Sequence, residues 1–236
     1  MAGKGIRFQQ AGYTLPKPLI PVNGRPMIQL VIENLRPKTE HCFIFICRQQ
    51  HINEYGLADK LKYWSSGCII LTVDEITEGA ACTVLLAKEL INNNSSLMIA
   101  NCDQWIDTDI DAYLADMETR NLDGLIMTMT ANDPKWSFVR LDDSGSITEV
   151  VEKQVVSDEA TVGIYNYRQG SDFVDSAEKM IHKKLRVNNE FYVAPTYNEM
   201  IHKGLHLGYY NIGKVGDGMY GLGTPDDLEK FEYFFS

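Results

Sequence analysis

The chain alternates short, almost wholly apolar runs with longer amphipathic segments over its first 133 residues. Such apolar runs are typical of strands buried on both faces, and apolar residues repeated at helical spacing predict helices. The apolar runs are residues 42–47, 68–73, 96–100 and 124–130. The amphipathic segments are residues 26–35, 52–64, 80–90 and 109–119. Strands that alternate with helices in this way predict an α/β fold with a doubly wound, mostly parallel sheet.

After Pro134 the pattern changes to shorter segments with one polar face. Residues 137–141 and 147–152 flank the turn signal Asp142-Asp143-Ser144-Gly145, which predicts a hairpin and with it a small antiparallel subregion. The other predicted elements are strands at residues 161–167 and 205–212 and helices at residues 171–184, 194–203 and 225–235. Since no linker, repeat or low-complexity segment intervenes, we expect a single domain over residues 1–236, with halves at 1–133 and 134–236.

Composition narrows the classes of partner. The 236 residues carry a formal net charge of −10, which argues against nucleic acid as a partner because such binding needs a basic face. A small anionic ligand is compatible with this charge, since a local basic loop can act inside an acidic shell. No apolar run approaches the ~20 residues of a membrane span, and no signal peptide is visible. The five cysteines form no CxxC pair, so we expect buried, reduced thiols and a cytoplasmic protein.

The opening loop carries the densest candidate chemistry. Gly3 and Gly5 leave backbone N–H groups unshielded, which lets anionic oxygens approach closely. Lys4, Arg7 and Lys17 add positive charge, and no acidic residue lies between them. Lys17 stands between two prolines, so its backbone is stiff and its ammonium loses little freedom on binding phosphate. These features favour a polyphosphate site, and a purely structural turn is the alternative.

This loop differs from the common phosphate loops. The GKS or GKT of the Walker sequence does not follow it, and it lacks the third glycine of the dinucleotide-binding fingerprint. Gly-rich phosphate loops normally follow a buried strand, whereas this chain begins at the loop itself. We therefore expect that a few residues of a first strand precede Met1.

Asp103 comes just after the apolar run at residues 96–100. An aspartate at the carboxyl end of a buried parallel strand lies in the crevice where open α/β sheets bind ligands. Its hard oxygen atoms suit Mg²⁺ that bridges phosphates, and capping of the next element is the alternative role.

Three further polar segments leave two interpretations open. The small residues that follow Glu78-Gly79 would let a flat base lie against the backbone, or would pack a tight loop on the sheet. Lys153 in Glu152-Lys153 would hold a sugar phosphate, or belong to an exposed charged pair. Asn189-Glu190, which precedes two aromatic residues, would contact a sugar or cap a helix. Because no Gly-x-Ser-x-Gly, Cys–His or HExxH pattern occurs, the chain offers phosphate and metal handling rather than a covalent nucleophile.

Several of these motifs occur in a recognisable order. They are residues 2–8 and 16–27, Glu78-Gly79-Ala80, Asn101-Cys102-Asp103, Glu152-Lys153, residues 161–165, Asn189-Glu190 and residues 223–228. In this order they resemble the sugar nucleotidyltransferase family, also called nucleoside-diphosphate-sugar pyrophosphorylases, within the NTP-transferase superfamily. The resemblance implies the Rossmann-like nucleotide-diphospho-sugar transferase fold. It also implies transfer of a nucleotidyl group from a nucleoside triphosphate to a phosphorylated sugar or alcohol, with release of pyrophosphate.

The resemblance implies a role for each matching residue. The residues implied to bind the nucleotide are Ala2, Gly3, Gly5, Glu78 and Gly79. Those implied to be catalytic are Arg7, Lys17 and Asp103, with Asp103 as the ligand of Mg²⁺. Those implied to surround the acceptor are Glu152, Lys153, Gly163, Asn189 and Glu190. Residues 1–133 would then be the nucleotide-binding half and residues 134–236 the acceptor-binding half. The implied product is a precursor for lipopolysaccharide or capsule synthesis, and assembly into a homo-oligomer is left open.

One position departs from the family pattern. Sugar-1-phosphate members often carry a second metal-binding aspartate two residues before the Gly-Thr-Pro motif, where this chain has Gly221. Asp217 would replace it only through a shifted loop, so a second metal ion is in question. This departure keeps open a nucleotide-binding regulatory protein without turnover. A glycosyltransferase of the same fold is a separate alternative. The lack of an Asp-x-Asp pair at Asn101-Cys102-Asp103 weighs against the glycosyltransferase.

Overall fold

The computed structural model describes residues 1, 3 and 5–235. Backbone contacts divide the chain into two compact units, each of which combines segments that lie far apart in the sequence. The first unit consists of Met1–Ile76, Cys102–Asp111 and Met219–Ser236. The second unit consists of Thr77–Asn101 and Ala112–Gly218. Within the described residues no helix combines the length and the apolar character that a membrane crossing requires.

The first unit contains short helices and short strands. Its helices are α1 (Ile6–Gln10), η1 (Lys17–Leu19), α2 (Met27–Asn34), α3 (Gln49–Tyr55), α4 (Leu57–Trp64) and α10 (Pro225–Phe234). Its strands are β1 (Pro21–Val22), β2 (Arg25–Pro26), β3 (Ile44–Arg48), β4 (Ile69–Val73), β6 (Gln104–Ile106) and β12 (Gly218–Gly221). Strands β3 and β4 pair in parallel, as the two apolar runs predicted, whereas β1 pairs with β2 and β6 with β12 in antiparallel fashion.

The single helix expected over residues 52–64 is wrong, because the segment forms two helices, α3 and α4. Gly56 separates them in the left-handed conformation, with φ of 59°, which ends the first helix. The apolar periodicity continues across this glycine, since Leu57 and Leu61 of α4 are buried. Periodicity alone therefore gave no sign of the break.

The second unit contains the longer strands. Its strands are β5 (Leu97–Ala100), β7 (Gly124–Thr130), β8 (Ser137–Leu141), β9 (Ile147–Glu152), β10 (Glu159–Tyr167) and β11 (Leu207–Val215). Its helices are α5 (Ala80–Leu85), α6 (Lys88–Ile91), α7 (Ile110–Thr119, which begins in the first unit), α8 (Gly170–His182), η2 (Ala194–Thr196) and α9 (Tyr197–His202). One continuous helix was expected over residues 80–90, and the structure has α5 and α6 in its place.

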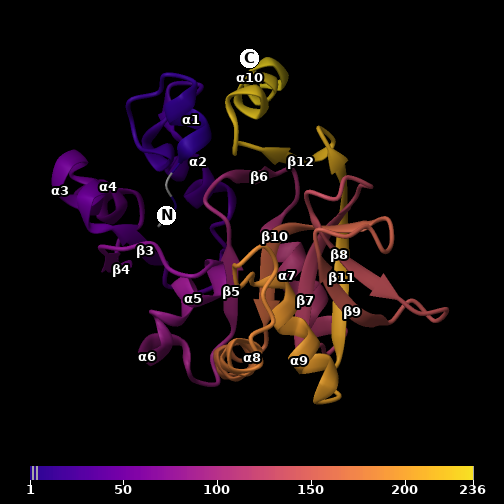
Figure 1. Cartoon of the computed structure of the whole chain (residues 1–236). Helices are drawn as coiled ribbons and strands as arrows, with labels where there is room; N and C mark the ends of the chain where they lie inside the picture. The colour runs from indigo at the N-terminus through magenta and orange to yellow at the C-terminus, as the bar shows by residue number, and fades with distance from the viewer. Residues whose placement is uncertain (2, 4, 236) are drawn as a thin grey trace. The chain divides into compact units, whose positions relative to one another are not determined.

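The sheet of the second unit confirms the α/β class. Strands β7 and β11 pair in parallel, and β10 lies between β5 and β7 and runs antiparallel to both (Figure 1). Hence β5, β7 and β11 run in one direction, and β10 is the reversed strand among them. Strands β8 and β9 form the expected hairpin around residues 142–146. Together with β10, to which β8 pairs, they make up the antiparallel subregion.

Helices cover both faces of this sheet. The Asn166 amide on β10 donates a hydrogen bond to the sulfur atom of Met117, which lies on α7. The neighbouring Tyr167 instead packs against Phe173 of α8 and stacks on Tyr197 of α9, with ring centroids 4.7 Å apart. Because successive side chains of a strand point to opposite faces, α7 covers one face and α8 and α9 cover the other. This is the doubly wound arrangement that the sequence predicted.

The cysteines are free thiols, as expected, but most of them are not buried. Cys47 is buried, and burial raises its pKa to about 11. Cys42 is exposed, and Cys68, Cys82 and Cys102 are partly exposed. The expectation of buried thiols is therefore wrong for four of the five cysteines, because a position in or beside an apolar run does not by itself bury a side chain.

Candidate functional site

The first unit brings Gly5, Lys17, Asp103 and Gly223 together. A Cβ atom built on Gly5 would lie 3.6 Å from the Cβ of Lys17, so the opening loop packs against η1. The Lys17 ammonium donates a hydrogen bond to the Asp103 carboxylate, and both side chains keep about a quarter of their surface exposed, 21% and 25%. A Cβ atom on Gly223 would lie 3.1 Å from Asp103 Oδ2 and 3.6 Å from Lys17 Nζ. We refer to these four residues as the Lys17–Asp103 cluster.

The backbone fixes the Lys17–Asp103 cluster from two sides. Pro16 and Pro18 flank Lys17 in the 3₁₀ helix η1, and the Lys17 ammonium also lies over the Phe8 ring, 5.9 Å from its centroid. The Asp103 carbonyl accepts a hydrogen bond from the N–H of Leu222, which lies next to Gly223. The structure thus joins segments 86 residues apart in the chain, and the carboxylate and the ammonium face each other at an accessible surface.

Two further residues of the opening loop are described. Among the described residues, none comes within 4 Å of a Cβ atom built on Gly3. Arg7 is exposed on α1, a helix that places the buried Phe8 ring next to Tyr13. Ala2, expected to contact the nucleotide, lies outside the described residues.

Asp103 is better suited to a metal ion that substrate phosphates also coordinate than to one held by protein side chains alone. Over residues 1, 3 and 5–235, no group of three His, Cys, Asp or Glu side chains is arranged to hold a metal ion. Mg²⁺ commonly takes one or two carboxylates and completes its octahedron with substrate phosphates and water. The accessible Asp103 carboxylate fits that use. A cation bound to Asp103 would share this carboxylate with the Lys17 ammonium.

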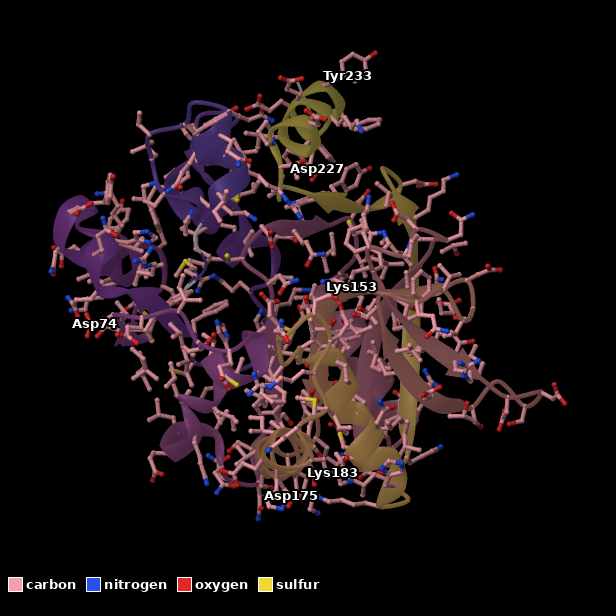
Figure 2. All side chains as sticks on the ribbon, in the orientation of Figure 1. Asp74, Lys153, Asp175, Lys183, Asp227 and Tyr233 are labelled. Atoms are coloured by element: carbon pink, nitrogen blue, oxygen red, sulfur yellow. The ribbon has the colours of Figure 1, made fainter. Side chains whose placement is uncertain are left out.

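Gly221, the position that departs from the family pattern, lies close to the carboxylate of Asp227. A Cβ atom on Gly221 would lie 3.3 Å from Asp227 Cγ (Asp227 is labelled in Figure 2). Asp227 is itself engaged at the start of α10, where its carboxylate accepts a hydrogen bond from Thr224 Oγ1. Asp217 lies in the second unit, 79% exposed, with its carboxylate 3.8 Å from the Lys214 ammonium. Its proposed substitution for the missing aspartate stays a prediction.

The second unit brings Glu152, Lys153, Glu190 and Tyr192 together. The Lys153 ammonium, labelled in Figure 2, donates a hydrogen bond to the Tyr192 hydroxyl and lies 4.6 Å from the centroid of its ring. That hydrogen bond, together with the nearby Glu152 and Glu190 charges, raises the pKa of Lys153. We refer to these residues as the Lys153 cluster.

Glu152 is the buried acid of the Lys153 cluster. It ends β9, and Ser137 on the paired strand β8 donates a hydrogen bond to its carboxylate. Burial raises the pKa of Glu152, and the Ser137 hydrogen bond and the Lys153 charge work in the opposite direction. Tyr165 on β10 is buried near this acid: burial raises the pKa of Tyr165, and the Glu152 charge acts in the same direction.

Glu78 and Gly79 pair with the segment that carries Tyr192. The N–H of Phe191 donates to the Glu78 carbonyl at 2.8 Å, and the N–H of Ala81 donates to the Phe191 carbonyl at 3.0 Å. Gly79 has φ of 135°, and a Cβ atom there would lie 2.4 Å from the Phe191 carbonyl oxygen. Only glycine fits such an approach between two backbones. The tight-loop interpretation of Glu78-Gly79 therefore holds in the structure, and it leaves nucleotide contact as a prediction.

The remaining predicted acceptor residues lie on turns and bulges. Asn189 has φ of 64° within a tight turn whose ends, Val187 and Glu190, form an isolated bridge. Gly163 lies where the register between β10 and β7 shifts, and its carbonyl accepts a hydrogen bond from the N–H of Asn101. Bulges of this kind often re-aim side chains beside functional sites.

Sequence reasoning did not give a role to Tyr192, Ser137 or Gly223. Tyr192 had a weak signal, since it follows a polar pair in a segment interpreted as a sugar-contacting loop. Gly223 lay inside a recognised motif without an assigned part. Nothing in the pattern distinguished Ser137 from other strand serines, because its contact with Glu152 arises only when β8 and β9 pair.

A comparison with known protein families identifies the family of this chain. The sequence model of the family described as nucleotidyl transferase matches residues 1–230. The chain therefore belongs to the nucleotidyl transferase family.

The chain is also similar to individual named proteins and solved structures. The chain is 25% identical over 226 residues to the bifunctional protein GlmU of Methanococcus aeolicus, covering 92% of this chain and 51% of GlmU. The chain thus spans about half the length of the curated relatives it matches. A crystal structure of the nucleoside-diphosphate-sugar pyrophosphorylase from Vibrio cholerae superposes with a TM-score of 0.83 at 25% identity, covering 99% and 98% of the two chains. The UTP-bound UGPase of Acinetobacter baumannii shares the fold, with a TM-score of 0.75 at 15% identity over 99% and 90% of the chains.

Proposed function

We propose that this chain transfers a nucleotidyl group from a nucleoside triphosphate to a sugar phosphate and releases pyrophosphate. The observation that carries the proposal is the Lys17–Asp103 cluster, an accessible ammonium–carboxylate pair beside two glycine backbones in a chain of the nucleotidyl transferase family. A triphosphate needs cationic partners and unshielded N–H groups, and a metal ion needs a carboxylate. Neighbouring folds that bind UTP or UDP-glucose support this choice of substrates.

The reaction needs no general base from the protein. A phosphate monoester has its second pKa at about 6, so an acceptor phosphate already carries a nucleophilic oxygen at neutral pH. That oxygen forms a bond to the α-phosphorus, the bond from this phosphorus to the oxygen bridging to the β-phosphate breaks, and the electron pair leaves with pyrophosphate. The protein then has to align the two phosphates and neutralise developing negative charge.

The residues divide this work between them. Lys17 would donate hydrogen bonds to the α-phosphate or to the leaving pyrophosphate, and Arg7 would hold the β- and γ-phosphates. Asp103 would hold Mg²⁺, which when bound neutralises phosphate charge and orients the triphosphate. Lys153 would hold the acceptor phosphate, with Glu152, Gly163, Asn189 and Glu190 around the sugar. Gly3, Gly5, Glu78 and Gly79 would face the nucleotide. The product would be an activated sugar of the kind used to build surface polysaccharides.

A matrix of nucleotides and acceptors tests the proposal. ATP, CTP, GTP, UTP and dTTP would each be combined, with Mg²⁺, with glucose 1-phosphate, N-acetylglucosamine 1-phosphate, mannose 1-phosphate and inositol 1-phosphate. Pyrophosphate release would be followed through a coupled pyrophosphatase. We expect one nucleotide and a small set of acceptors to give turnover that EDTA abolishes.

Two variants show whether the pyrophosphate release depends on Lys17. Lys17→Ala should lose turnover with the active pair, whereas Lys38→Ala, whose side chain is 83% exposed in the same unit, should retain it. A wild-type protein that binds a nucleoside triphosphate but releases no pyrophosphate with any acceptor would overturn the proposal in favour of a regulatory nucleotide-binding protein. Turnover of UDP-glucose without a triphosphate would favour a glycosyltransferase.

A further inference from the structure

Lys153 is held by a neutral partner rather than by either nearby acid. Its ammonium donates to the Tyr192 hydroxyl at 2.5 Å and lies over the face of the same ring. Burial raises the pKa of Tyr192, and the charge of the nearby Glu190 carboxylate acts in the same direction. The hydrogen-bond partner of the Lys153 ammonium is therefore the Tyr192 hydroxyl, and the exposed Glu190 carboxylate lies nearby. A phenol directs a lysine without cancelling its charge, which leaves that charge available to an anion.

The backbone of Lys153 is also fixed in an unusual conformation. Its φ is 58°, in the left-handed region that residues with a Cβ rarely adopt. Its N–H donates to the Trp136 carbonyl at 3.0 Å, which ties this turn to the start of the β8 strand. A lysine side chain has four rotatable bonds, so a fixed backbone alone does not place its ammonium. The placement comes from Tyr192.

Tyr192 is itself anchored through the residue before it. Phe191 is fully buried and forms backbone hydrogen bonds with Glu78 and Ala81 on either side of Gly79. The guanidinium of Arg186 lies 4.5 Å from the centroid of the Phe191 ring and forms an ion pair with Glu78 at 2.9 Å. The segment that carries Tyr192 is therefore fixed to the loop of residues 78–81 next to the point where the phenol begins.

From this geometry we infer that Tyr192 is a positioning residue, which holds the Lys153 ammonium ready to bind the phosphate of the acceptor. The inference rests on the proposed function for the identity of that phosphate. Tyr192 then affects binding of the acceptor through Lys153, without contacting the triphosphate.

The first experiment measures Lys153 directly and needs no turnover. Wild-type protein, Tyr192→Phe and Tyr63→Phe would be labelled with trace acetic anhydride, and the acetylation rate of Lys153 relative to Lys38 would be measured by mass spectrometry. Tyr63 is 87% exposed, so its variant controls for the loss of a phenolic hydroxyl. We expect faster labelling of Lys153 in Tyr192→Phe alone, because its ammonium has lost the acceptor that protects it. Equal relative rates in all three proteins would overturn the inference.

The second experiment uses steady-state kinetics with UTP and glucose 1-phosphate, or with whichever pair the matrix shows to be active. Loss of a hydrogen bond to a charged group predicts an acceptor KM about 10-fold higher in Tyr192→Phe, with the nucleotide KM unchanged. Tyr192→Leu, which also removes the ring, should raise the acceptor KM further. A fall in kcat with both KM values unchanged, or an equal rise of both, would indicate a general structural role and overturn the inference.

The two proposals fail in distinguishable ways. A wild-type protein without pyrophosphate release overturns the proposed function, whereas the labelling comparison still decides whether Tyr192 holds Lys153. Faster labelling of Lys153 with an unchanged acceptor KM would show that Tyr192 holds this lysine but that the lysine does not bind the acceptor, which overturns the inference while turnover is intact.

Discussion

The two lysine clusters use their charges in opposite ways. In the first unit, Lys17 forms an ion pair with Asp103, so its charge is neutralised until a ligand competes for it. In the second unit, Lys153 is bound to a neutral phenol and keeps its charge. A phosphate that approaches Lys17 therefore has to rearrange an existing pair, whereas one that approaches Lys153 meets a group already in place. The difference is compatible with the metal-bound triphosphate proposed for the first cluster, because a cation on Asp103 would compete with Lys17 for the carboxylate and leave the ammonium free to bind phosphate.

The largest expected effect comes from a substitution in the Lys17–Asp103 cluster. Asp103→Asn removes both the partner of Lys17 and the carboxylate proposed for Mg²⁺, so kcat for pyrophosphate release should fall about 100-fold or more. Acetylation of Lys17 in the free protein should become faster, since its ammonium loses an ion-pair partner. Asp109→Asn is the control, since Asp109 is 59% exposed in the same unit. Wild-type turnover of Asp103→Asn would show that this carboxylate binds no catalytic metal.

The next effect concerns the second cluster. Lys153→Ala should raise the acceptor KM about 10- to 100-fold while the nucleotide KM stays near the wild-type value, because the lost charge is the one proposed to bind the acceptor phosphate. Steady-state kinetics with each substrate varied in turn measure the split. Lys135→Ala, at a position 60% exposed in the same unit, provides the control. Nucleotide and acceptor KM values that rise together would remove the contrast between the two clusters.

Gly79→Ala tests the contact between the loop of residues 78–81 and Phe191, the residue before Tyr192. The added Cβ would lie 2.4 Å from the Phe191 carbonyl oxygen and would be on a residue with positive φ, so the loop has to shift. Gly145→Ala is a matched control with φ of 79° and open space around the new methyl group. We expect Gly145→Ala to lower the free energy of unfolding by about 1 kcal/mol, and Gly79→Ala by about 1–3 kcal/mol more. Urea denaturation of both variants measures the difference, and equal losses would mean that the loop is not clamped on Phe191.

The strands of this fold were largely predictable, and their pairing was not. The apolar runs around Phe45, Ile70, Ile99 and Met127 became β3, β4, β5 and β7, since a continuous apolar run is a local feature of the sequence. The insertion of β10 between β5 and β7 leaves no such mark, because it depends on contacts between distant segments. Short strands such as β6 and β12 were missed for a related reason, since three or four residues are too few for a periodic pattern.

The candidate site divides in the same way. Motif residues such as Lys17 and Asp103 stood out by their type and neighbours, but their direct pairing joins positions 86 residues apart. Tyr192 and Lys153, 39 residues apart, meet only once the turn at Asn189 and the end of β9 are in place. Residue chemistry is local and can be interpreted from sequence, whereas the partner that neutralises or preserves a charge is a property of the fold.

The smallest expected effect concerns the acid of the second cluster. Burial raises the pKa of Glu152 above its ordinary value of 4.5, so the folded protein binds this proton more tightly than the unfolded chain does. Linkage then requires the free energy of unfolding to fall as pH rises from about that value through the higher folded-state pKa. Glu152→Gln has no group to titrate and should lose this part of the pH dependence, whereas Glu149→Gln, 49% exposed on the same strand, should keep it. Urea denaturation from pH 4 to 8 measures the slope. A slope in Glu152→Gln equal to that of the wild type would show that Ser137 and Lys153 fully offset the burial.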